Sequence, residues 1–149
     1  MRGGLLFFLT SNLLTHMLTI SKTASTILDK IIAAGNGEDA FTIDNAAGAF
    51  MPLHFEELPP ITVPNLGFCS VYSLAHYYEQ NGDMMRDPEM CVLETLAGQR
   101  IPYSYRLDSM GVETYSVCLE KGGFYPVKYG ELIQFFNMWM SNIQQQQEL

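Results

Sequence analysis

Hydrophobic positions near the start of the chain recur at helical spacing, and they predict a helix with one apolar face. Ser21 or Thr23 can cap its beginning. We expect it to end at Gly35, where glycine supplies the left-handed conformation that terminates many helices. The apolar positions are Ala24, Ile27, Leu28, Ile31 and Ile32.

A second helical pattern closes the chain and begins near Pro126. Its stripe of large apolar residues is wide, so this helix must pack on another element, and a sheet face is the simplest partner. We expect the glutamines at 144–147 to form a frayed polar end. The stripe consists of Leu132, Phe135, Phe136, Trp139 and Ile143.

Between the helices, short segments rich in β-branched and aromatic residues alternate with turn residues, which is typical of strands. The proline-rich stretch 59–67 is expected to be a loop, and 108–111 fits a tight turn. Connections this short favour antiparallel pairing of neighbours. The sequence therefore predicts an α+β fold, with a meandering antiparallel sheet flanked by an N-terminal and a C-terminal helix. The predicted strands are 40–44, 50–58, 70–80, 90–96, 101–108 and 112–120.

One predicted hairpin holds most of the polar chemistry. Asn81-Gly82 favours a type I′ turn, because both residues tolerate positive φ. Pro88 cannot donate a ladder hydrogen bond, so the returning strand should be irregular there. On the first strand the small residues Ser73 and Ala75 predict the face beneath a helix, which leaves His76 on the more open face.

The charge balance of 8 basic and 16 acidic residues gives a net charge of −8, which opposes direct binding to nucleic acid or to an anionic membrane. Three cysteines without a C-x-x-C pair support neither a disulfide framework nor a zinc knuckle. Reduced thiols favour a cytoplasmic location, and nothing in the sequence calls for a cofactor.

The first twenty residues are nearly free of charge and resemble a signal peptide in part, but polar residues interrupt the apolar run and no cleavage pattern follows. We therefore expect residues 1–16 to be a non-native or disordered extension, with Met17 as the natural start. A single domain at 17–149 follows. Export is the alternative.

The hairpin end is the predicted binding surface, because its methionines offer adaptable apolar contacts among polar groups. No serine, cysteine or glycine-rich loop has a catalytic setting. The alternative is a metal-dependent hydrolase, whose ion would be held by His76, Asp83, Asp87 and Glu89, although this spacing matches no specific metal motif. The predicted binding residues are Gln80, Asn81, Asp83, Met84, Met85, Arg86, Asp87 and Glu89.

The segment at 76–90 reads HYYEQNGDMMRDPEM, and it follows GAFMPLHFEEL and precedes IPYSYRLD and a helix that contains tryptophan. With these stretches the chain resembles an uncharacterised bacterial domain family of phage, plasmid and conjugative-element proteins. The resemblance spans about residues 17–143 and implies an intracellular accessory protein of a mobile element, without assigned catalytic residues. Together with the residues above, it favours a non-enzymatic module that binds another protein, such as one of a host system.

Overall fold

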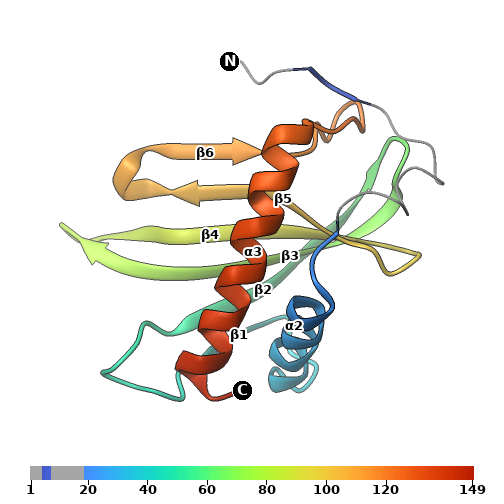
Figure 1. Ribbon diagram of the computed structural model, residues 1–149. Helices are drawn as coiled ribbons and strands as arrows, with labels where there is room; N and C mark the ends of the chain where they lie inside the picture. Colours follow the sequence, from blue (N-terminus) through green and yellow to red (C-terminus); the bar gives the residue numbers. More distant parts are fainter. Residues whose placement is uncertain (1–4, 8–18) are drawn as a thin grey trace.

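A six-stranded antiparallel sheet lies at the centre of this computed structural model, which describes residues 5–7 and 19–149 (Figure 1). The strands pair in chain order from β1 to β6, so the predicted meander is confirmed. A short 3₁₀ turn, η1 (Asp108–Met110), joins the last two strands. The strands are β1 (Ala40–Ile43), β2 (Leu53–Val63), β3 (Gly67–Gln80), β4 (Asp83–Thr95), β5 (Arg100–Leu107) and β6 (Val112–Tyr115).

Helix α2 (Lys22–Ala34) begins where the sequence predicts, because the Ser21 hydroxyl accepts a hydrogen bond from the Ala24 N–H at 3.0 Å. Its end differs from the prediction: Gly35 is right-handed, with φ −78°, and the left-handed residues are Asn36 and Gly37. Glycine is nevertheless required at position 35. A Cβ there would overlap the ring of Phe41, which packs directly on the backbone.

Helix α3 (Pro126–Gln147) crosses the sheet, as Figure 1 shows, and buries its apolar stripe against it. The Phe135 ring meets Tyr105 of β5 at 5.0 Å between centroids. The two helices also touch each other, since the Ser21 N–H donates to Asn137 Oδ1 at 2.9 Å. The result is a single α+β domain in two layers.

The prediction of a loop at 59–67 is wrong for the first half of this stretch, because β2 continues through Pro59 and Pro60 to Val63. The register with β3 shifts between Leu58 and Ile61. Strand β1 pairs with β2 only as far as Glu56, so on that side of β2 the two prolines face no strand. Proline is tolerated at such an edge because no neighbour needs its missing N–H.

The expectation of a frayed end at 144–147 is also wrong. Gln147 is fully buried, and its Oε1 accepts a hydrogen bond from the Asn45 N–H at 2.7 Å. Its Nε2 donates to the Met51 carbonyl at 3.1 Å. The last turn of α3 is therefore attached to the loop between β1 and β2.

Most of the predicted extension at 1–16 lies outside the described residues, and so does Met17, the predicted natural start. Of its described part, Phe7 pairs with Phe124, and their backbone N–H groups donate to each other's carbonyls at 2.7 and 2.6 Å. In the described ranges, no helix has both the length and the apolar character needed to cross a membrane.

Candidate interaction surface

The β3–β4 hairpin ends in the predicted Asn81-Gly82 turn, with φ of 53° and 85° at its two residues. Gln80 pairs with Asp83 across the turn, and both are exposed. Met84 follows with 61% of its surface exposed. Figure 1 shows this end of the hairpin projecting past α3, so no helix covers it.

The turn at η1 lies beside this hairpin and is joined to it by Arg86. The Arg86 backbone N–H donates to Asp108 Oδ2 at 2.7 Å, and its Nε donates to the same oxygen at 3.0 Å. These hydrogen bonds hold the pKa of Asp108 below its ordinary value. Arg86 therefore ties two neighbouring turns together through its backbone N–H and its Nε.

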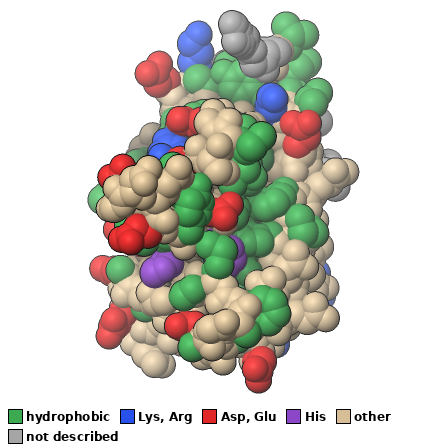
Figure 2. Space-filling view, turned by 90° about the vertical axis from the view of Figure 1, so that its left-hand side faces the viewer, with side chains coloured by type: hydrophobic (Ala, Val, Ile, Leu, Met, Phe, Trp, Pro, Cys, Tyr) green, Lys and Arg blue, Asp and Glu red, His purple; other side chains and the backbone are tan. Residues whose placement is uncertain are grey.

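The two turns form one exposed end of the molecule, which we call the hairpin-end surface and define as residues 80–86 and 108–112. Met110 is 71% exposed and Val112 38% exposed on one turn, and Met84 is exposed on the other. Figure 2 views this end and shows hydrophobic side chains gathered beside acidic ones. Both turns belong to the same end because alternate turns of a meander share an end, a signal that the sequence already contained.

Glu89 lies farther back on β4, on the face that α3 does not cover. The Ser73 hydroxyl donates to Glu89 Oε2 at 2.8 Å, and Arg86 approaches its other oxygen at 3.6 Å. Its side chain is 15% exposed. The predicted binding residue Glu89 is thus mainly an internal partner of Arg86 and Ser73.

His76 lies on the opposite face of the same hairpin. Only 7% of it is exposed, its Nδ1 is 2.9 Å from the Pro52 carbonyl oxygen, and its ring meets Trp139 of α3 at 5.5 Å. The prediction that His76 occupies the more open face is therefore wrong. The Trp139 ring packs against His76, while on the other face the Ser73 hydroxyl bonds to Glu89.

The predicted metal ligands are consequently not brought together. His76 points to α3, Glu89 points to the other face, and Asp83 lies at the exposed turn. Burial is the main cause that raises the pKa of Tyr105, and the charge of the nearby Asp87 raises it further. Within residues 5–7 and 19–149, no group of three or more His, Cys, Asp or Glu side chains is placed to hold a metal ion.

The face away from α3 also carries a hollow of about 350 Å³ along β1–β3, lined among others by Thr42, His54, Ser73 and Tyr77. Burial is the main cause that lowers the pKa of His54, followed by the charge of His76. Burial likewise raises the pKa of the neighbouring Cys91 thiol, and Glu89 adds to this effect. A protonated thiol is a poor nucleophile, so this face offers hydrogen-bonding groups without an activated cysteine.

Comparison with models of known protein families identifies the family of this chain. The chain belongs to the family described as a domain of unknown function (DUF6908), whose model matches residues 22–149 and so includes the whole hairpin-end surface. No curated protein and no solved structure matches the chain.

Proposed function

We propose that this protein is a non-enzymatic interaction module whose partner protein binds the hairpin-end surface. In the setting that the sequence resemblance implies, it acts in the bacterial cytoplasm as an accessory protein of a mobile genetic element. Its partner there would belong to a host system.

One observation carries the proposal: Met84 and Met110 are exposed at 61% and 71% on two turns that a side-chain ion pair joins. Exposed methionines lose contact with water when a partner covers them, and their flexible thioethers adapt to its shape. Because Arg86 and Asp108 already hold the turns together, binding would require little further ordering of the backbone.

The surface is also mixed in character, which suits a protein partner better than a small apolar ligand. Asp83 lies next to Met84, and Gln80 and Asn81 complete a polar border. An apolar centre with a polar rim is the usual anatomy of a protein interface.

The proposal is tested by affinity capture from the native host with wild-type protein, a Met84→Glu/Met110→Glu variant and a Leu96→Glu variant. Leu96 is 85% exposed on the turn between β4 and β5, at the opposite end of the sheet, so it is a matched control. We expect wild type and Leu96→Glu to recover the same partner and the double variant to lose it. Equal recovery by all three would place the interface elsewhere.

A further inference from the structure

Strand β6 forms one edge of the sheet, and half of its backbone groups point away from β5. The Ser116 N–H donates to the Tyr103 carbonyl at 3.0 Å, and the register continues as Tyr105–Thr114 and Leu107–Val112. In an antiparallel ladder the residues between such pairs direct their N–H and C=O outward. These residues are Glu113 and Tyr115, and no backbone hydrogen bond from another described residue reaches them.

The opposite edge of the sheet is formed by the short strand β1 and, beyond its end, by β2. Pro59 and Pro60 of β2 have no N–H to offer beyond the end of β1. The Glu57 N–H already donates to the Asp39 carbonyl at 2.6 Å. Beyond β1, this edge therefore offers fewer free backbone N–H groups for pairing than β6 does.

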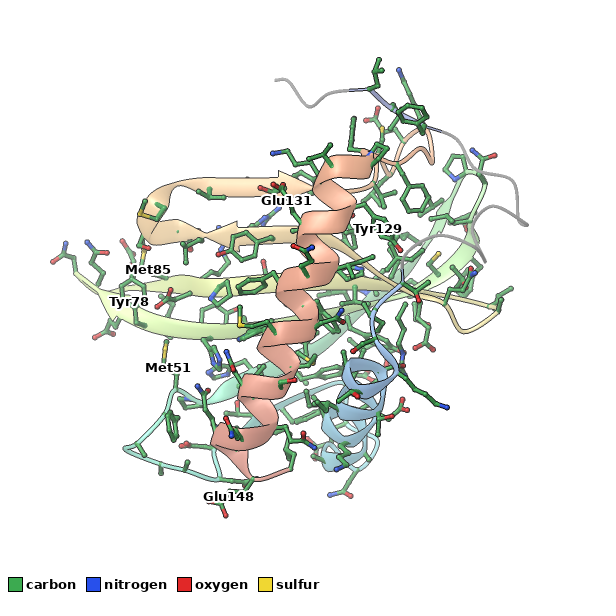
Figure 3. The ribbon with its side chains drawn as sticks, viewed as in Figure 1. Met51, Tyr78, Met85, Tyr129, Glu131 and Glu148 are labelled. Atoms are coloured by element: carbon green, nitrogen blue, oxygen red, sulfur yellow. The ribbon has the colours of Figure 1, made fainter. Side chains whose placement is uncertain are left out.

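A groove runs beside β6 on the α3 side, with a volume of about 210 Å³. Val112 and Thr114 form one wall, and Leu132 and Phe135 of α3 form the other. Figure 3 shows Glu131 on α3 beside β6, at the rim of this groove. A strand paired with β6 would place every second side chain in the groove, opposite Val112 and Thr114.

The remaining side chains of such a strand would lie on the other face, beside Glu113. Arg106 pairs with Glu113 at 3.2 Å, yet the Glu113 side chain stays 52% exposed. Lys128 is 3.9 Å from Glu131, which stays 61% exposed. Both carboxylates thus have room for a further cation, in a protein whose net charge is −8.

We propose that β6 docks an extended peptide in which apolar residues alternate with lysine or arginine. The apolar side chains enter the groove against Phe135, and the basic ones meet Glu113, with further attraction from Glu131 at the rim. The peptide backbone bonds to the outward groups of Glu113 and Tyr115 and adds a seventh strand. This site shares Val112 with the hairpin-end surface but does not use Met84 or Met110.

A second copy of this chain is a poorer occupant of the same edge. Pairing of β6 with β6 would bring two Glu113 and two Glu131 carboxylates to one seam, and like charges in such positions are destabilising. A basic strand removes this repulsion, so charge complementarity selects the peptide.

The test uses isotope-labelled full-length protein and an acetylated, amidated octapeptide of alternating lysine and valine. We expect hydrogen exchange at the Glu113 and Tyr115 amides to slow by about tenfold at saturation. The same peptide N-methylated on the groups that face β6 keeps its charge but should fail to protect these amides. Glu131→Lys should weaken binding several-fold, while Glu38→Lys, an equal charge change on an exposed residue far from β6, should not.

Three results would overturn the inference. The first is unchanged exchange at both amides. The second is equal weakening by Glu131→Lys and Glu38→Lys, which would indicate attraction by net charge alone. The third is protection of these amides that rises with protein concentration without peptide, which would assign the edge to a second copy. A Met84→Glu/Met110→Glu variant should bind the peptide normally, which separates this site from the two exposed methionines of the hairpin-end surface.

Discussion

The part of the sheet beneath α3 and the hairpin ends beyond it use polar side chains in opposite ways. Beneath α3, His76 is buried and bonds to one backbone carbonyl, and Gln147 at the end of α3 is buried and bonds to two backbone groups. At the hairpin ends, Arg86 and Asp108 are partly exposed and bond mainly to each other. Polar groups under the helix thus maintain the core, whereas those beyond it hold a surface in shape.

The comparison predicts its largest effect at His76. His76→Ala should destabilise the fold by about 2–4 kcal/mol, because it opens a cavity beside Trp139 and leaves the Pro52 carbonyl without its partner. Urea unfolding followed by circular dichroism measures this loss. The control is His54→Ala on the other face, which should cost under about 1 kcal/mol, since His54 is only half-buried. Equal losses would remove the distinction between the faces.

Gln147→Ala should have the next largest effect, about 1–3 kcal/mol, because the Asn45 N–H and the Met51 carbonyl lose their hydrogen bonds to a buried side chain. Gln145→Ala, an exposed neighbour on the same helix, should change stability by less than about 0.5 kcal/mol. Thermal unfolding of both variants gives the comparison. A neutral Gln147→Ala would mean that the end of α3 is frayed after all.

Asp108→Asn should cost about 1 kcal/mol at pH 7, because it removes the charge that pairs with Arg86 on a partly exposed surface. The pKa of Asp108 is lower in the fold than in the unfolded chain. Its contribution is therefore complete above the unfolded pKa of about 3.9 and is lost as the pH falls through the folded value. Urea unfolding of wild type and variant should give a difference that shrinks below about pH 4. A constant difference down to acid pH would contradict the pairing.

Met84→Glu and Met110→Glu should have the smallest effect on stability, within about 0.5 kcal/mol, because neither side chain contributes to the core. Thermal unfolding of each single variant measures it. A loss of several kcal/mol would show that these methionines support the fold and are not available for a partner.

Much of the fold was predictable because it depends on local patterns. The Ser21 cap, the Asn81-Gly82 turn and the stripe of α3 specify their elements through nearby residues. Gln147 was missed because its partners lie about a hundred residues earlier in the chain. The continuation of β2 through its prolines was missed because propensity does not reveal which strand lies at an edge.

The candidate surface was predictable in part. The turn and its exposed Met84 follow from the sequence, but the role of Arg86 depends on Asp108, 22 residues away on another hairpin. The face of His76 was misassigned because small residues suggested a helix above them. The contact between Trp139 and His76 shows which face of the strand lies beneath α3, and the sequence of the strand alone does not reveal this contact.

Hydrogen exchange by mass spectrometry on the captured complex tests the central claim most directly. If the hairpin ends are the contact surface, peptides that cover 80–86 and 108–112 should exchange more slowly in the complex than in the free protein, while those that cover the turn at 96–99 should not change. Protection confined to other segments, with both hairpin ends exchanging as in the free protein, would contradict it.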